Sequence, residues 1–332
     1  MIFLIGYCHL EVLKNLEQFD ASSKGGALCI GNFDGVHIGH QKLLAEATGL
    51  AKSLSAPAVV LTLHPHPMRI LSPERMPEPI CRLEDKLTWL QQAGADIVVL
   101  EPTTLEILQL GPQQFIDRLV LKYIQPRWIV EGQSFRFGRN RSGDVNLLQQ
   151  LGRDRNFQVR VLPSVQVDLG PDGKFAVSSS LIRELLRAGL VAQAAHCLGR
   201  GHLITGIVAR GTGRGRMLGF PTANMDQIAQ LTPAEGVYAG RGWIKDKCYP
   251  AAISVGTAIT FDHGERLVEA VLLGLDDDIY GQEIRLEFYQ HLRQQRRFPS
   301  PAELADQILA DCQGVRQLVE DGQIELPATR AS

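Results

Sequence analysis

The chain has 332 residues, 45% of them hydrophobic and 21% charged, and its 34 Lys and Arg against 36 Asp and Glu give a net charge of −2. This length predicts two domains with a core each, and the composition excludes disordered, collagen-like and coiled-coil proteins. The charge balance argues against nucleic-acid or anionic-membrane partners. A local basic site for a phosphorylated small molecule stays compatible with it.

Signals for export or membrane insertion are missing from the sequence. The opening MIFLIGYCHLEVL has no basic residues before its apolar run, so it predicts a strand rather than a signal peptide. No stretch of eighteen apolar residues occurs, and the six cysteines are scattered without a CxxC pair. These features predict isolated thiols in a reducing compartment, and hence a cytoplasmic protein.

Short apolar runs alternate with helical patterns over the first 190 residues. Strands are predicted at 26–31, 57–63, 95–100, 128–132 and 157–163, and helices at 40–54, 83–93 and 112–124. Strands separated by helices of this length are typical of βαβ units in a parallel sheet. Ligands of such sheets bind beyond the carboxyl ends of the strands.

The pattern changes near residue 200. After two short predicted helices at 179–188 and 191–198, closely spaced strands are predicted at 203–209, 236–244, 249–255, 267–275 and 283–289. This spacing favours a small antiparallel β-barrel. A final helix is expected over 301–321, with Ser300 before it and Glu303 as a capping pair. We therefore expect an α/β domain over residues 1–190 and a barrel domain over 191–332.

The segment GNFDGVHIGHQ (31–41) connects the first of these predicted strands to the helix after it. Its glycines allow a tight turn and a close approach to a ligand, and the start of the helix offers backbone N–H groups to phosphate oxygens. His37 and His40 are three residues apart, so both rings can reach one bound group. Two imidazoles at a helix N-terminus suit the stabilisation of charge on a phosphorus centre.

This segment resembles the signature of the HxGH nucleotidyltransferases. Its longer form, FDGVHIGHQ, resembles the bacterial bifunctional riboflavin kinase/FMN adenylyltransferase family, also called FAD synthetases. The resemblance implies that the first domain adenylylates FMN with ATP and releases pyrophosphate, with His37 and His40 as catalytic residues. It assigns ATP contacts to Gly31, Asn32, Phe33, Asp34 and Gly35.

Three further segments fit this family in chain order: LTLHPHP (61–67), EGQSFRFGRNRSG (131–143) and VSSSLIRELL (177–186). Taken alone, each also fits an ordinary structural role: a stiff loop, a solvated loop and a helix N-cap. The resemblance assigns flavin contacts to His66, Phe135 and Phe137, positive charge near phosphates to Arg136, Arg139 and Arg141, and ATP contacts to Ser179, Ser180 and Arg183.

A second glycine-rich motif, RGTGRGRMLGFPTANM (210–225), lies in the predicted barrel. It lacks the GKS/T of a Walker A loop. Thr222 and Asn224 would offer two oxygen ligands on one side of an extended segment, a donor type that suits Mg²⁺. The stretch resembles the riboflavin kinase signature, which implies Mg²⁺ at Thr222 and Asn224. It also implies ATP contacts at Gly211, Gly213, Gly215, Arg216 and Gly219.

The segment ERLVEAVLLGLDDDIYGQEIRLEF (265–288) resembles the family stretch that carries the kinase base, and the matching residue is Glu269. A carboxylate in an apolar strand would be desolvated and its pKa raised, which suits a general base, although a solvated strand face would also explain a glutamate there. The following LRQQRRF (292–298) resembles the loop that covers the flavin, which assigns a flavin contact to Arg293.

The sequence departs from the family pattern at Ser134, Leu190, Ala258, Ile259 and Gly274. The main interpretation is a bifunctional enzyme that uses ATP, riboflavin and FMN as substrates. One alternative, favoured by Ala258 and Ile259, is an FMN adenylyltransferase whose barrel only binds flavin. Another is a nucleotidyltransferase for a different phosphorylated substrate. No protein partner can be predicted from the sequence.

Overall fold

The computed structural model describes residues 10–170, 173–210, 220–257 and 266–326. The chain forms two compact units. The first contains Met1–Pro77 and Leu83–Val177, and the second contains Glu78–Arg82 and Ser178–Ser332. Within the described ranges, no helix combines the length and apolar character needed to cross a membrane.

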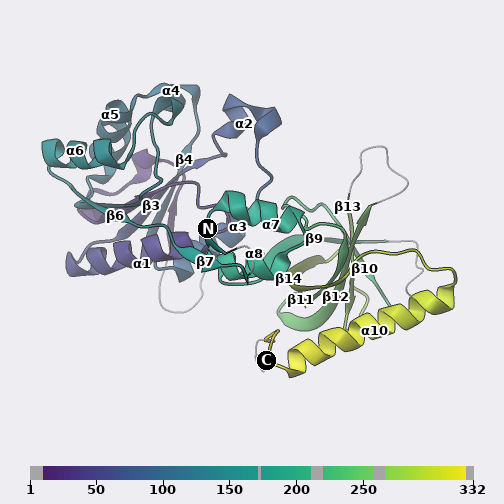
Figure 1. Ribbon diagram of the computed structural model, residues 1–332. Helices are drawn as coiled ribbons and strands as arrows, with labels where there is room; N and C mark the ends of the chain where they lie inside the picture. Colours follow the sequence, from purple (N-terminus) through teal and green to yellow (C-terminus); the bar gives the residue numbers. More distant parts are fainter. Residues whose placement is uncertain (1–9, 171–172, 211–219, 258–265, 327–332) are drawn as a thin grey trace. The chain divides into compact units, whose positions relative to one another are not determined.

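A six-stranded parallel sheet forms the centre of the first unit (Figure 1). Its strands, in chain order, are β1 (Glu11–Leu13), β2 (Ala27–Ile30), β3 (Ala58–His64), β4 (Ile97–Pro102), β5 (Trp128–Gly132) and β6 (Gln158–Leu162). Their order in the sheet is β1-β4-β3-β2-β5-β6, and every neighbouring pair is parallel. The predicted parallel α/β architecture is therefore confirmed.

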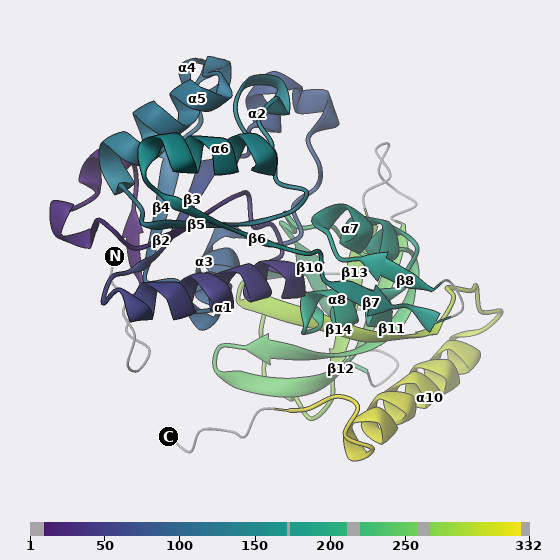
Figure 2. The same ribbon diagram turned by 60° about the vertical axis from the view of Figure 1, so that its left-hand side comes forward.

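Helices cover both faces of this sheet (Figure 2). One face packs against α1 (Ile38–Ser53) and α3 (Leu83–Gln92). The other packs against α4 (Leu105–Gln109), α5 (Pro112–Phe115), the π-helix η4 (Ile116–Ile124) and α6 (Val145–Arg155). Short elements complete the unit: η1 (Leu16–Gln18), η2 (Ala21–Ser23), α2 (Met68–Leu71), η3 (Pro73–Arg75), η5 (Arg139–Arg141) and the hairpin of β7 (Gln166–Asp168) and β8 (Lys174–Ala176).

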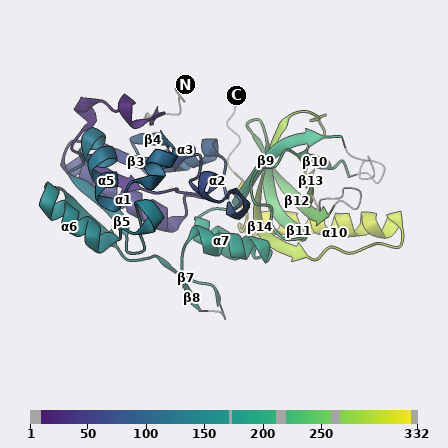
Figure 3. The same cartoon turned by 90° about the horizontal axis from the view of Figure 1, so that it is seen from above.

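The second unit is a closed antiparallel barrel (Figure 3). Its strands are β9 (His202–Ala209), β10 (Ala223–Asp226), β11 (Gly236–Ile244), β12 (Lys247–Thr257), β13 (Arg266–Leu272) and β14 (Glu283–Arg293). They close in the order β10-β13-β12-β11-β14-β9. The barrel is confirmed, although some bounds differ from expectation. β10 was not predicted, β13 ends at Leu272 rather than at residue 275, and β12 and β14 extend beyond the predicted 249–255 and 283–289.

Three helices accompany the barrel: α7 (Ser179–Arg187), α8 (Val191–Leu198) and α10 (Pro301–Glu320). Apolar residues of α10 pack on the outside of β11 and β12. Ser300 caps α10 as expected, because its hydroxyl accepts the Glu303 N–H at 3.3 Å.

A segment from the first half of the chain, Glu78–Arg82, belongs to this second unit, and we call it the insert segment. Its Pro79 carbonyl accepts the Leu231 N–H at 2.8 Å, and its Ile80 side chain is buried. The boundary between the two compact units lies between Val177 and Ser178, whereas the boundary expected from the sequence lies between residues 190 and 191. The division into independent domains stays a prediction.

Candidate active sites

The loop between β2 and α1 begins with Gly31 and is held in place by buried side chains. Phe33 and Val36 have φ values of 48° and 37°, in the left-handed region that such residues rarely adopt. Both side chains are buried in the core of the first unit, which holds the backbone in this conformation. Gly35, at φ 79°, supplies a turn that other residues would adopt only with strain.

The two histidines of this loop lie together at the start of α1. His37 is the N-cap, and its Nδ1 accepts the backbone N–H of His40 at 3.3 Å. The two rings are stacked, with centroids 3.6 Å apart and an angle of 16° between their planes. A Cβ atom at Gly39 would lie 3.1 Å from the His37 ring, so a glycine there leaves room for this ring. The structure thus brings His37 and His40 together.

Asn32 and His66 also lie beside each other, with the Asn32 amide nitrogen 3.0 Å from His66 Nε2. His66 Nδ1 accepts the Met68 N–H at 3.1 Å, so a neutral ring carries its proton on Nε2 and donates it to the Asn32 amide with the amide oxygen turned toward the ring. Lys86, which the sequence analysis did not single out, donates from Nζ to the Asn32 carbonyl at 2.8 Å. A residue predicted to contact flavin and one predicted to contact ATP therefore belong to one hydrogen-bonded group.

The aromatic segment after β5 divides into a buried and an accessible part. Phe137 is 5% exposed, stacks on Phe135 and packs near Phe115, so it belongs to the core. Phe135 is only partly buried, and Arg136 and Ser134 are exposed. Of the two phenylalanines predicted to contact flavin, Phe135 is the one with surface left for a ligand.

Ser179, Ser180 and Arg183, which are predicted to contact ATP, lie in the second unit. The two serines begin α7, and Arg183 follows one turn later. The N-cap of α7 is Ser178, whose hydroxyl accepts the Leu181 N–H at 3.2 Å, and Ser179 and Ser180 begin the helix. Arg183 is 8% exposed, and its Nε donates to the Glu78 carbonyl at 2.8 Å. The structure gives Arg183 a bond to the insert segment, while its contact with ATP stays a prediction.

On the barrel, strand register brings together residues that are predicted to serve the kinase and are distant in sequence. Asn224 on β10 lies directly opposite Glu269 on β13, and Glu269 lies opposite Ser254 on β12. Directly opposed residues of antiparallel strands have Cβ atoms about 5 Å apart. Val268 and Ala270, on either side of Glu269, are buried, so Glu269 points to the other face of its strand.

The remaining predictions for the barrel concern its loops and the end of β14. The predicted ATP contacts Gly211, Gly213, Gly215, Arg216 and Gly219 lie outside the described residues, as do Ala258 and Ile259. Arg293, predicted to contact flavin, forms an ion pair with Asp311 of α10, with Nη2 2.7 Å from Oδ2. Gly274 lies in a turn after β13 at φ 88°, a conformation that explains a glycine at this departure from the family pattern.

Two further structural features were not identified from the sequence. Glu131 of β5 is 3% exposed, and its Oε1 accepts the Ile30 N–H at 2.6 Å. Burial raises the pKa of the Glu131 carboxyl well above its usual range, and the bond from Ile30 acts in the opposite direction. The signal was available, because Glu131 is a charged residue in an apolar strand, as Glu269 is.

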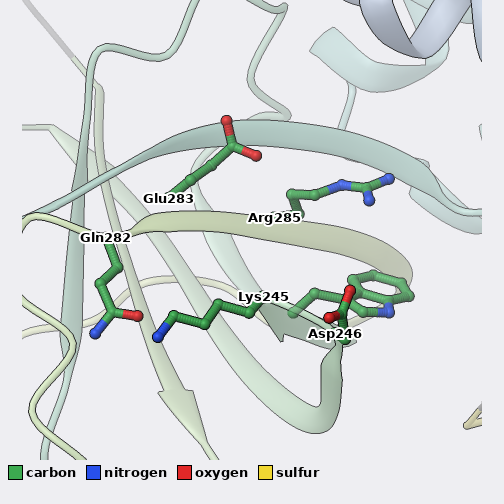
Figure 4. Close-up of a pocket in the computed structure, with 6 residues that line it drawn as sticks. Lys245, Asp246, Gln282, Glu283 and Arg285 are labelled. Atoms are coloured by element: carbon green, nitrogen blue, oxygen red, sulfur yellow. The ribbon is translucent and has the colours of Figure 1, made fainter. Parts of the chain in front are cut away.

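The second feature is a hollow of about 370 Å³ on the outside of the barrel (Figure 4). It is lined by Trp243, Lys245, Asp246, Gln282, Glu283 and Arg285. The hollow thus lies at β11 and β14. Strand β12 separates it from β13 on one side, and strand β9 separates it from β10 on the other. None of the predicted site residues lines it.

Comparison with known proteins identifies both halves of the chain. Residues 19–178 match the family model of FAD synthetase, and residues 198–319 match that of riboflavin kinase. The Bifunctional riboflavin kinase/FMN adenylyltransferase of Escherichia coli strain K12 is 34% identical over 303 residues, which cover 90% of this chain and 94% of that protein. The protein of the same description from Bacillus subtilis strain 168 is 31% identical and covers 86% and 90% of the two chains.

A solved structure, described as a macrolide-efflux protein from Streptococcus pneumoniae, has the same fold. It matches with a TM-score of 0.82 and 28% identity, over 92% of this chain and 98% of that chain. The two family models together with the relatives that match nearly from end to end show that this chain belongs to the bifunctional riboflavin kinase/FMN adenylyltransferase family.

Proposed function

We propose that this bifunctional transferase forms FMN from riboflavin and ATP at the Asn224–Glu269 pair of the barrel, and FAD from FMN and ATP at the β2–α1 loop of the first unit. The observation that carries this assignment is the assembly of one candidate catalytic group in each unit. His37 and His40 stack at the start of α1, and Asn224 and Glu269 oppose each other in the barrel.

In adenylyl transfer, a phosphate oxygen of FMN attacks the α-phosphorus of ATP, and the bond from that phosphorus to pyrophosphate breaks. The FMN phosphate is already ionised, so the protein's task is to position and neutralise two anions. His37 accepts at Nδ1 from His40 N–H, so in the neutral ring Nε2 carries the proton and would donate to a phosphate oxygen. The N–H groups at the start of α1 would hold further phosphate oxygens.

In the kinase reaction, the terminal ribityl hydroxyl of riboflavin attacks the γ-phosphorus of ATP and ADP leaves. Glu269 would accept the hydroxyl proton, acting as a general base. Its neighbour Ser254 is already engaged, because the Ser254 hydroxyl accepts from Gln295 Nε2 at 2.7 Å. Gln295 follows β14, so this bond attaches the loop after β14 to the strand beside Glu269.

Mg²⁺ fits the donors at the start of β10. Within the described residues, no three His, Cys, Asp or Glu side chains gather in a way that could hold a metal. Thr222 and Asn224 supply a hydroxyl and an amide oxygen, so the ion would complete its shell with ATP phosphate oxygens and water, as Mg²⁺ commonly does. When bound, Mg²⁺ would neutralise charge on the transferred phosphate.

A cytoplasmic location agrees with the thiols. Among the described residues, Cys29, Cys197, Cys248 and Cys312 carry free thiols. Free thiols in several parts of a fold are typical of a reducing compartment.

The decisive experiment incubates the purified chain with riboflavin and Mg-ATP and follows FMN and FAD by chromatography over time. FMN should appear first and FAD should follow. A parallel incubation that starts from FMN should give FAD without riboflavin. Riboflavin binding without any FMN would contradict the kinase assignment and favour a barrel that only binds flavin.

A further inference from the structure

Strands β2 and β5 separate at their carboxyl ends. Their backbone pairing covers Ala27 with Trp128 and Leu28 with Ile129 and goes no further. On its other side, β2 stays paired with β3 up to Ile30, and the Gly31 N–H still donates to the Leu61 carbonyl at 3.1 Å. The order of strands reverses at β2 and β5, and such a reversal is where parallel sheets bind their ligands.

The Glu131 side chain occupies the place of the missing backbone partner. Successive N–H groups of a strand point to opposite neighbours, so the Ile30 N–H faces β5 while that of Gly31 faces β3. No β5 carbonyl is paired with Ile30, and the Glu131 carboxyl accepts this N–H instead, at 2.6 Å. Glu131 stays in register with Val161 of β6, so β5 itself is not displaced from its other neighbour.

A side-chain acceptor has a consequence that a strand carbonyl would not have. Continued backbone pairing would bring β2 and β5 to about 4.8 Å from each other and close the sheet at this edge. The longer reach of Glu131 satisfies the Ile30 N–H while the strand ends remain apart. Ile30 is 8% exposed, so without Glu131 its N–H would be left without an acceptor in a buried place.

We propose that Glu131 is a positioning residue for adenylyl transfer, which holds Ile30 and thereby fixes the start of the loop that carries Asn32, His37 and His40. It acts through the backbone and does not touch substrate. Ile30 is directly followed by Gly31, so a shift at Ile30 displaces the loop at its origin. This inference rests on the proposed role of the β2–α1 loop.

The test compares Glu131→Met with Glu131→Gln in the full-length protein. Methionine fills a similar volume without a strong acceptor, whereas glutamine keeps an oxygen for the Ile30 N–H. Because small displacements of catalytic groups are costly, Glu131→Met should lower kcat for FAD formation from FMN roughly 10- to 100-fold and change KM for ATP little. Glu131→Gln should keep kcat near the wild-type value, and FMN formation should continue in both variants.

Glu101→Met is the matched control. Glu101 is a half-buried carboxylate on β4 of the same sheet, and it accepts the Leu16 N–H at 2.6 Å. Its loss should lower the melting temperature without lowering kcat. Three results would overturn the proposal: wild-type kcat in Glu131→Met, an equal loss in Glu131→Gln, or an equal loss in Glu101→Met. His40→Ala, measured alongside, tests the proposed site itself, because normal FAD formation there would contradict that site whatever Glu131→Met does.

Discussion

The two candidate sites are assembled from different kinds of structure. At the sheet, a contiguous loop follows one strand, and the placement of its two histidine rings depends on backbone geometry: His37 caps α1, and Glu131 holds Ile30. At the barrel, Asn224 and Glu269 come from separate strands and meet through register. A sheet site of this kind should be sensitive to changes that displace the loop, whereas a barrel site should lose function mainly through its own side chains.

The largest expected effect is at the barrel. Glu269→Gln keeps the size of the side chain but cannot accept a proton, so FMN formation should fall about 10²- to 10⁴-fold. Conversion of added FMN to FAD should be unchanged, which is measured by chromatography in the same preparation. Glu283→Gln on β14 is the control, because Glu283 forms an exposed ion pair with Arg82. A Glu269→Gln enzyme as fast as wild type would place the base elsewhere.

The corresponding test at the sheet is His40→Ala. Removing one donor to the developing charge should lower FAD formation about 10²- to 10³-fold, while riboflavin is still phosphorylated. His196→Ala, which removes an exposed imidazole from α8, should leave both reactions unchanged. FAD formation within a few-fold of wild type in His40→Ala would contradict the assignment of this site.

A third prediction concerns what the barrel needs in order to fold. A fragment 191–332 lacks α7, whose Ile182 and Leu186 are buried and whose Leu186 carbonyl accepts the Ala234 N–H at 3.0 Å. Loss of large buried side chains typically costs about 2–5 kcal/mol each. A fragment 178–332 should therefore melt at a clearly higher temperature than 191–332 in a calorimetric scan. Equal melting temperatures would show that α7 contributes little to the barrel.

The smallest expected effect is on stability as a function of pH. The pKa of Glu131 is raised in the folded state above about 4.5, its ordinary value, so the folded protein holds this proton more tightly than the unfolded chain does. The stabilisation is complete below that ordinary value and is lost as pH rises toward the folded pKa. Glu131→Gln cannot titrate, so its stability relative to wild type in urea should increase over this range. A difference independent of pH would contradict a buried, protonated Glu131.

The regular elements could be predicted from sequence because their patterns are local. The predicted strand 128–132 matches β5 residue for residue, and the HxGH loop lies between a strand and a helix as expected. Strand β10 escaped prediction because only four residues form it and its pairing depends on β9 and β13. The α6 helix was not predicted either, because only Leu148, Leu151 and Gly152 are buried in it, which leaves a weak apolar pattern.

The sites could be predicted only in part, for a physical reason. Contiguous motifs point to His37, His40 and Glu269, whose catalytic roles stay predictions, but the partners of a side chain depend on the tertiary fold. Nothing in the local sequence pairs Arg293 with Asp311 or buries Phe137 against Phe115. The bond between Glu131 and Ile30 joins residues 101 positions apart and requires knowledge of the strand order.

The insert segment has a consequence for anyone who would exchange the two halves between relatives. Because Glu78–Arg82 is part of the second unit, the polypeptide passes from one unit to the other three times, after Pro77, after Arg82 and after Val177. A hybrid enzyme joined at a single point near residue 178 would thus combine a barrel from one parent with five residues of another. Arg82 and Glu283, which form an ion pair, and Glu78 and Arg187 would then come from different parents. Functional hybrids should require that this pentapeptide be transplanted together with the barrel.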